Sequence, residues 1–298
     1  MSLLTALLAR VPASWMNTLA GLRHRHRSVD RCASVIAGLI RGRDSCIQTG
    51  AGRGLRFNPG RSAASYVLGN HEPETQVLLT DLLGPGMTFY DIGANVGFCS
   101  MIAARMVAPG GHVISFEPLP ENVAALSHNA AINHFGHVTV FETALSDTDG
   151  EMTFAISERP TWGKLHSSNL PPDRHVDDIR VSVRRLDSVV DESHLPLPQI
   201  IKMDVEGAEN DVLKGARETL RRGRPILLIE LHGTGAQVLQ TLTQLDYCVL
   251  TLGPWRDVGE AHWNAVIAGV PSERPDLIHV VAGKRLDVAI PSGGGDAA

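Results

Sequence analysis

Short apolar runs and longer amphipathic segments alternate along the chain from about residue 89 onward. A short apolar run bounded by turn residues is typical of a buried strand, and a 3.6-residue apolar period is typical of a helix. The predicted strands lie at 89–91, 112–116, 137–142, 199–204 and 225–231, and the predicted helices at 96–107, 120–132, 208–221 and 235–244. This alternation predicts parallel strands joined by right-handed helical crossovers.

Upstream of this alternation, a further helix is predicted to begin at residues 71–74. Pro73 suits the first helical turn, and the acidic residues beside it are favourable near a helix N-terminus. The apolar stripe of this helix consists of Val77, Leu78, Leu79, Leu82 and Leu83. Residues 50–57 are rich in glycine but lack the Lys-Ser/Thr ending of a phosphate loop, so we expect a hairpin turn there.

The second half of the chain contains a predicted hairpin and two closing strands. The hairpin pairs 151–156 with 180–184, and a long polar loop from Ser157 to Asp178 separates its strands. Loops of this length in a compact domain are usually functional or disordered. Strands near 247–251 and 277–282 are expected to close the sheet.

Composition divides the chain into three predicted parts. Residues 1–65 form a basic, helical N-terminal extension, residues 66–290 form one α/β domain, and residues 291–298 form a disordered tail. Nine arginines and only two acidic residues lie in residues 1–60. Such an arm is either a solvated extension, the more common case, or a contact for a phosphate-bearing partner.

The composition of the whole chain is that of a globular protein in a reducing compartment. A net charge of −5 gives no general attraction to nucleic acid or to an anionic membrane. No stretch reaches the roughly 18 apolar residues of a membrane-spanning helix, and the apolar N-terminus is a poor signal peptide. We therefore expect a cytoplasmic location. The four cysteines lack disulfide or zinc spacing and are read as reduced thiols: Cys32, Cys46, Cys99 and Cys248.

The most informative stretch is Phe89–Phe98, where an apolar run meets an acid and then two glycines. Asp91 lies at the carboxyl end of the predicted strand, where open α/β sheets bind ligands. Gly93 and Gly97 allow a tight turn and a close approach of the backbone to a ligand. A dinucleotide fold would place a glycine at the position of Asp91. Since a carboxylate repels a pyrophosphate and suits a sulfonium or amino group, this turn favours S-adenosylmethionine (SAM) over NAD.

Three further strands also end in polar residues. Glu117 follows the strand at 112–116, 26 residues after Asp91, which is about the spacing of the acid that binds ribose hydroxyls in nucleotide-binding folds. The third strand leads into residues 144–147, and the fourth ends in Asp204 and Glu206.

Together these motifs resemble the FkbM family of SAM-dependent methyltransferases over residues 66–231. The motifs that carry the resemblance are Asp91-Ile92-Gly93-Ala94-Asn95-Val96-Gly97, Phe116-Glu117-Pro118, Ala144-Leu145-Ser146-Asp147 and Ile201-Lys202-Met203-Asp204-Val205-Glu206-Gly207-Ala208-Glu209. The resemblance implies a Rossmann-like class I methyltransferase fold, with a mostly parallel seven-stranded sheet and helices on both faces. It also implies SAM as cofactor.

By motif position, Asp91 and Gly93 are expected near the methionine portion of SAM. Glu117 is expected at its ribose, and the segment 144–147 is expected at its adenine. The resemblance thus implies these cofactor-binding residues: Asp91, Gly93, Ala94, Asn95, Gly97, Glu117, Pro118, Ala144, Leu145 and Ser146.

Catalysis is predicted at the ends of the fourth and fifth strands. An unactivated hydroxyl is a poor nucleophile, so methyl transfer to it benefits from a general base. The two-residue period of a strand puts Lys202, Asp204 and Glu206 on one side, and His232 emerges at the same edge. His232 has the pKa range of a base, although a histidine that caps a strand end is nearly as common. Two carboxylates alone indicate a metal only weakly, so no metal is predicted.

The expected reaction is O-methylation of a hydroxyl on a small molecule such as a sugar or a polyketide. Methylation of a carboxylate, an amine or a macromolecule stays open, as does non-catalytic SAM binding. The chain lacks the Asn/Asp-Pro-Pro-aromatic motif of nucleic-acid methylation, so no nucleic-acid partner is expected. A cluster of Trp255, His262, Trp263 and Asn264 either forms a wall of the acceptor site or packs a loop. The oligomeric state stays open.

Overall fold

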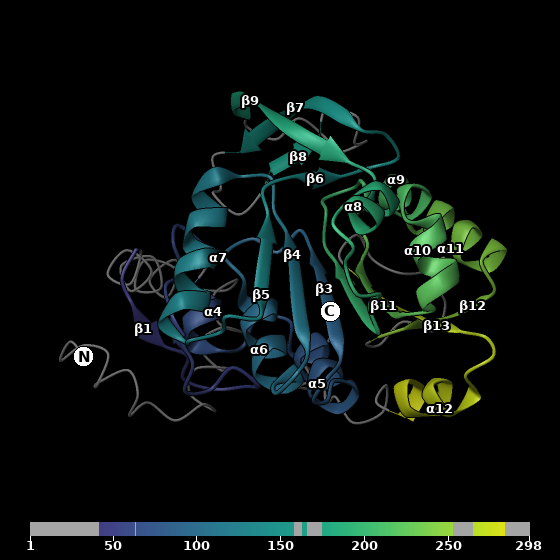
Figure 1. Ribbon diagram of the computed structural model, residues 1–298, viewed down its shortest axis with the longest axis horizontal. Helices are drawn as coiled ribbons and strands as arrows, with labels where there is room; N and C mark the ends of the chain where they lie inside the picture. The colour runs from purple at the N-terminus through teal and green to yellow at the C-terminus, as the bar shows by residue number, and fades with distance from the viewer. Residues whose placement is uncertain (1–41, 63, 158–162, 166–174, 253–264, 284–298) are drawn as a thin grey trace, which may run out of the picture.

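The computed structural model describes residues 42–62, 64–157, 163–165, 175–252 and 265–283 (Figure 1). The cluster that contains Trp255 and Trp263, the basic arm up to residue 41 and the predicted tail lie outside these described residues. Within them, no helix is long and apolar enough to cross a membrane.

A mostly parallel seven-stranded sheet forms the centre of the domain, which confirms the predicted fold class. Its strands in spatial order are β12 (Tyr247–Thr251), β13 (Val266–Pro271), β11 (Ile226–Glu230), β10 (Ile200–Met203), β3 (Thr88–Ile92), β4 (His112–Phe116) and β5 (Val138–Phe141). Only β13 is antiparallel to its neighbours. In the centre of the sheet, Lys202 of β10 pairs in register with Asp91 of β3 and with Leu228 of β11.

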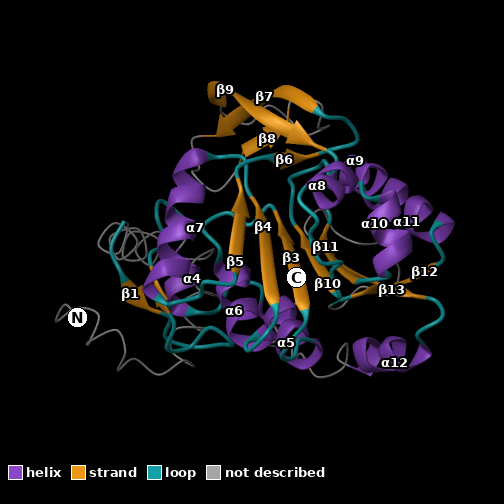
Figure 2. Ribbon diagram, viewed as in Figure 1, coloured by secondary structure: helices purple, strands orange, loops and turns teal. Residues whose placement is uncertain are grey.

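Helices cover both faces of this sheet (Figure 2). One face packs against α4 (Ala64–Leu68), α5 (Pro73–Leu82), α6 (Phe98–Val107), α7 (Pro120–Ile132) and α12 (Pro275–Gly283). The other face packs against α8 (Leu186–Glu192), α9 (Glu209–Gly215), α10 (Arg217–Gly223) and α11 (Gly235–Gln244). The apolar runs of the strands therefore fill two separate cores, one on each side.

The prediction of a closing strand at 277–282 is wrong. Residues 275–283 form the helix α12, and the strand that closes the sheet is β13, at 266–271. A short apolar run cannot be assigned to strand or helix by periodicity alone, and Pro275 with Asp276 supplies a helix start. β13 was not predicted because it contains Gly269, and glycine is unfavourable inside a strand. The absence of a side chain at this position lets β13 pack closely, since a Cβ there would lie 3.3 Å from the Leu242 side chain.

Two helix predictions also need correction. The helix expected at 208–221 is divided at Ala216 into α9 and α10. In α5, Val77 does not belong to the buried stripe, because it is 41% exposed, whereas Leu78 and Leu79 are buried. Thr75 and Gln76 are buried instead of Val77.

The predicted N-terminal hairpin is confirmed, as β1 (Ser45–Cys46) pairs with β2 (Arg56–Phe57) in antiparallel fashion. Residues 45–46 are therefore strand and not part of the short helices expected over 1–48. Phe57 is fully buried and stacks edge-on against Phe98 of α6 at 6.0 Å between ring centroids. The domain boundary at residue 66 stays a prediction, although this hairpin shares the core on its side of the sheet.

A second, four-stranded sheet lies across one end of the main sheet (Figure 1). Its strands are β6 (Ala144–Leu145), β9 (His175–Arg184), β7 (Gly150–Ser157) and β8 (Gly163–Leu165). The antiparallel pair β7 and β9 confirms the predicted hairpin. The segment 157–178 is not wholly loop as expected, since β8 and the start of β9 lie within it.

Candidate active site

The turn after β3 is shaped by two glycines in a left-handed conformation. Gly93 has φ of 77°, and a Cβ at this position would collide with the backbone carbonyl oxygen of Asp204. Gly97 has φ of 83° and precedes α6, where a Cβ would meet the Leu126 side chain at 2.7 Å. Both positions therefore require glycine for conformation and for space. As a result, the turn after β3 lies directly against the chain that leaves β10.

Asp91 is buried beside this turn and is incompletely hydrogen bonded. Ser100 donates its hydroxyl hydrogen to Asp91 Oδ2 at 2.5 Å. The other oxygen, Oδ1, is buried and has no hydrogen-bond partner among the described residues. Burial raises the pKa of Asp91, and the nearby Lys202 and the Ser100 hydrogen bond oppose that rise. A buried acceptor without a partner is costly, so Oδ1 is suited to a donor that arrives with a ligand.

Glu117 follows β4 and connects the glycine turn to the start of α7 by hydrogen bonds. Its carboxylate accepts hydrogen bonds from the backbone N–H of Asn95 at 2.8 Å and of Leu119 at 3.1 Å. The side-chain amide of Asn122 donates a third bond at 3.0 Å. Burial raises the pKa of Glu117 to about 7 even though these hydrogen bonds favour the carboxylate.

These residues border a cleft of about 630 Å³ at the carboxyl ends of β3, β4 and β10. Six of the predicted cofactor-binding residues line it: Gly93, Asn95, Glu117, Pro118, Ala144 and Leu145. Four others are buried and outside the lining: Asp91, Ala94, Gly97 and Ser146. Apolar walls from outside the predicted cofactor-binding residues come from Phe116, Leu119 and Phe154. Its lining combines apolar walls with a few polar groups, as small-molecule sites do.

Asp204 and Glu206 also line this cleft, whereas Lys202 lies behind them. Lys202 Nζ is 3.3 Å from Asp204 Oδ2 and 3.6 Å from Glu72 Oε1. Burial opposes the charged ammonium, but Glu72 and Asp204 outweigh that effect and hold the pKa of Lys202 well above its usual range. Lys202 therefore stays charged and joins the site to the segment before α5.

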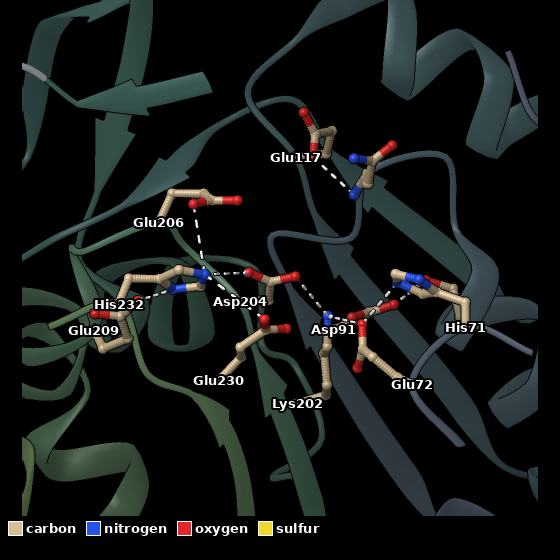
Figure 3. Close-up of polar contacts among 12 residues, drawn as sticks. His71, Glu72, Asp91, Glu117, Lys202, Asp204, Glu206, Glu209, Glu230 and His232 are labelled. Carbon is tan, nitrogen blue, oxygen red and sulfur yellow. Dashed lines mark hydrogen bonds and ion pairs between the residues drawn. The ribbon is translucent and has the colours of Figure 1, made fainter. Parts of the chain in front are cut away.

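His232 lies beyond β11 and is surrounded by carboxylates from three segments (Figure 3). Its Nδ1 is 2.9 Å from Glu209 Oε1. Its Nε2 lies 3.5 Å from Glu206 Oε2 and 3.8 Å from an oxygen of each of Asp204 and Glu230. The structure thus brings together all four predicted catalytic residues, because Lys202 contacts Asp204 and Asp204 approaches His232.

Burial and neighbouring charge shift the pKa values in this cluster. For His232, burial opposes protonation, but the hydrogen bond to Glu209 and the charges of Glu206 and Asp204 raise its pKa to about 9. Burial raises the pKa of Glu206 to about 7 and that of Glu230, with the help of the Asp204 charge, to about 8. Several ionisable groups with shifted pKa values beside one cleft are typical of a functional site.

Three residues of this network were not identified from the sequence as site residues. Glu209 belongs to the fourth motif but is not among the predicted site residues, yet it is fully buried and holds the His232 ring. Glu230 ends β11 two residues before His232, so the period of the strand could have placed it on the same side. Glu72 has φ of 43° before Pro73, and its Oε2 is buried without a partner among the described residues. No sequence signal indicates that Glu72 pairs with Lys202, which lies 130 positions later.

Asp204, Glu230 and His232 each present one oxygen or nitrogen atom of the kind that binds metals, and these atoms lie within 4.8 Å of one another. The cleft suits a nucleoside cofactor, because its lining combines polar groups with aromatic and aliphatic walls.

Comparison with known proteins identifies similar sequences. The profile of the methyltransferase FkbM domain matches residues 91–249, which contain all four motifs. The 2-O-methyltransferase NoeI of Sinorhizobium fredii is 31% identical over 153 residues, covering 47% of this chain and 61% of NoeI. The 31-O-demethyl-FK506 methyltransferase FkbM of Streptomyces tacrolimicus is 31% identical over 162 residues, covering 46% of this chain and 62% of that protein.

The hexuronic acid methyltransferase AglP of Haloferax volcanii is 27% identical over 143 residues, covering 48% of this chain and 55% of AglP. The chain therefore spans less than two thirds of the length of each of these relatives. Among solved structures, methyltransferase FkbM from Methylobacillus flagellatus KT is 20% identical with a TM-score of 0.44, over 64% of this chain and 45% of that one.

Proposed function

Because the chain belongs to the FkbM methyltransferase family, we propose that it methylates a hydroxyl group of a small molecule such as a sugar or a polyketide, with SAM as methyl donor. One observation carries the proposal. The carboxylates of Asp204 and Glu206 line the same cleft as the glycine turn and Glu117. A proton acceptor and a nucleoside site therefore share one space.

The residues around the cleft fit the cofactor. Glu117 is suited to the ribose hydroxyls because an ionised carboxylate has lone pairs beyond the three hydrogen bonds that it accepts. Asp91 Oδ1 lacks a donor, which the ammonium of the methionine portion could supply. The apolar walls from Leu119 and Phe154 are suited to adenine. When bound, the cofactor supplies an electrophilic methyl group on a sulfonium.

Asp204 and Glu206 then act on the acceptor. One of these carboxylates would accept the proton of the acceptor hydroxyl as its oxygen is methylated, and the demethylated cofactor would be the leaving group. Lys202 keeps Asp204 ionised and in place through the ion pair of 3.3 Å. His232 does not line the cleft, so it acts through Asp204 and Glu206 as a positioning residue.

The first test separates turnover from cofactor affinity. Replacement of Asp204 by Asn keeps the shape of the side chain and removes the charge, so we expect turnover to fall by roughly 10²–10⁴-fold. The affinity for S-adenosylhomocysteine, measured by calorimetry, should change by less than about threefold. The matched control is Asp211→Asn on α9, which among the described residues pairs with the exposed Lys214 and should keep wild-type turnover. Equal turnover in both variants would remove Asp204 from the mechanism.

The second test identifies the atom that is methylated. The full chain would be incubated with methyl-labelled SAM and a panel of hydroxylated sugars and polyketides, and the products analysed by mass spectrometry. Methyl ethers resist alkaline hydrolysis, whereas methyl esters are cleaved. Label that alkali releases would identify a carboxylate acceptor, and label on nitrogen an amine; either result would overturn the proposal of a hydroxyl acceptor.

A further inference from the structure

Three side chains converge on one point behind the cleft, from the ends of two neighbouring strands. Asp204 follows β10, Glu230 ends β11 and His232 follows it, and their ligand atoms lie within 4.8 Å of one another. Ligand bonds of about 2.0–2.6 Å put two atoms on opposite sides of one cation about 4–5 Å apart. The spacing of these atoms therefore fits a single metal ion.

The His232 ring is oriented as a metal ligand. Because Glu209 accepts a hydrogen bond at 2.9 Å, Nδ1 carries a hydrogen, and the neutral ring then presents a lone pair on Nε2. Glu209 is itself held by the Thr234 hydroxyl at 2.6 Å and by the backbone N–H of Gly207 at 2.9 Å. A carboxylate that fixes the second nitrogen of a histidine is the usual support of a metal-binding imidazole.

The Nε2 atom of His232 is aimed into the cluster but makes no close contact there. The side chain is 3% exposed, and the nearest carboxylate oxygens are 3.5–3.8 Å away, beyond the 2.7–3.2 Å typical of a hydrogen bond. Among the described residues, the Glu230 carboxylate accepts no hydrogen bond either, and its one ion pair is with this nitrogen at 3.8 Å. A cation between these atoms would be coordinated by all of them.

The charge of the cluster also favours a cation. Four carboxylates surround one imidazole: Asp204, Glu206, Glu209 and Glu230. The nearby ammonium, that of Lys202, already pairs with Glu72 as well as with Asp204. When these carboxyl groups are all ionised, the cluster holds an excess of negative charge in a largely buried place, where charge needs a partner.

We propose that Asp204, Glu230 and His232 form a site for a divalent cation, although the sequence predicted no metal. Two carboxylates and one imidazole suit an ion such as Mn²⁺, since oxygen ligands predominate and a nitrogen ligand is tolerated. The inference rests on the proposed function for its role: the cation lies beside the cleft and lowers the pKa of an acceptor hydroxyl that approaches it. Glu206, which lines the cleft, then accepts the proton.

The test uses Mn²⁺ alone as probe, with the full chain freed of metal by chelation. Titration followed by electron paramagnetic resonance of free Mn²⁺ should show one site. Glu230→Gln and Glu209→Gln should each weaken Mn²⁺ binding by roughly 10–100-fold, Glu230 as a ligand and Glu209 as the group that orients His232. The matched control, Glu218→Gln, removes an exposed carboxylate that forms an ion pair with Arg221 in the described part of the chain, and should bind Mn²⁺ like the wild type. Thermal melting of each variant checks that it is folded.

Absence of Mn²⁺ binding at millimolar concentration, or equal affinity in Glu218→Gln and the two site variants, would overturn the metal site. The cluster would then hold a protonated imidazole among carboxylates. Methyl transfer that persists in the chelated protein would leave the proposed function standing without the cation. Conversely, one Mn²⁺ site in a protein that methylates no hydroxyl would support the site and contradict the function.

Discussion

Glu117 should make cofactor affinity depend on pH near neutrality. Burial raises the pKa of this carboxyl to about 7, so in the free protein it carries a proton over much of the range below that value. Ribose hydroxyls donate hydrogen bonds, and the ionised carboxylate accepts them without competition from its own hydrogen. The affinity for the cofactor should therefore be highest above pH 7 and should decrease as the pH falls through 7.

The magnitude follows from the ionised fraction of Glu117. With a pKa of about 7, that fraction is about one tenth at pH 6 and about nine tenths at pH 8. The dissociation constant for S-adenosylhomocysteine should rise about tenfold between pH 8 and pH 6, which corresponds to about 1.4 kcal/mol. Asp91 is the charged group that most affects Glu117, and its negative charge supports the high pKa.

Calorimetry in buffers of different ionisation enthalpy measures this effect directly. At pH 7, binding should release about half a proton, because the ligand selects the ionised half of the molecules. Glu117→Gln serves as control: it keeps the shape of the side chain, binds more weakly and should lose the pH dependence that Glu117 causes. An affinity equal at pH 6 and pH 8 in the wild type, or the same pH dependence in Glu117→Gln, would refute the reasoning.

Two further predictions concern stability, measured by urea denaturation. Gly93→Ala should destabilise the domain by roughly 1–3 kcal/mol or more, because its φ of 77° is strained for alanine and the new Cβ would collide with the carbonyl of Asp204. As a control, Gly84→Ala has no atom within 4 Å of the added Cβ, so its stability should stay within about 0.5–1 kcal/mol of the wild type. Phe57→Ala should cost roughly 3–5 kcal/mol, since the ring is fully buried, and the exposed Val77→Ala should cost far less. If Phe57→Ala unfolded at the same urea concentration as Val77→Ala, the hairpin would not be part of the core.

The central half of the sheet could be predicted from sequence because its elements are short, alternate regularly and are separated by turn residues. The strands β3, β4, β10 and β11 each differ from their predicted bounds by no more than one residue at either end. On the C-terminal side the edge strand β12 was also predicted, but its neighbour β13 was not, because β13 contains Gly269 and ends in Pro271, both unfavourable in strands. Packing against neighbouring strands outweighs that local preference.

The residues of the candidate site were likewise predicted only in part. Asp204 and Glu206 follow a strand that the pattern identifies, so their place at the edge of the sheet follows from the fold. The partners of these residues depend on contacts between distant segments. Glu209 reaches His232 only because α9 begins beside the end of β11, and Glu72 reaches Lys202 only because the chain before α5 lies beside β10. Neither contact has a local signature.

The small sheet of β6, β7, β8 and β9 contributes a wall to the cleft without being part of the main sheet. Phe154 of β7 reaches into the cleft, yet β7 shares no backbone pairing with the seven strands that carry Asp91 and Asp204. Substitutions in β7 and its neighbours can reshape one wall of the cleft while the end of the main sheet, where Asp204 and Glu206 lie, keeps its geometry. An architecture of this kind separates changes in what the cleft can hold from changes in the carboxylates that act there.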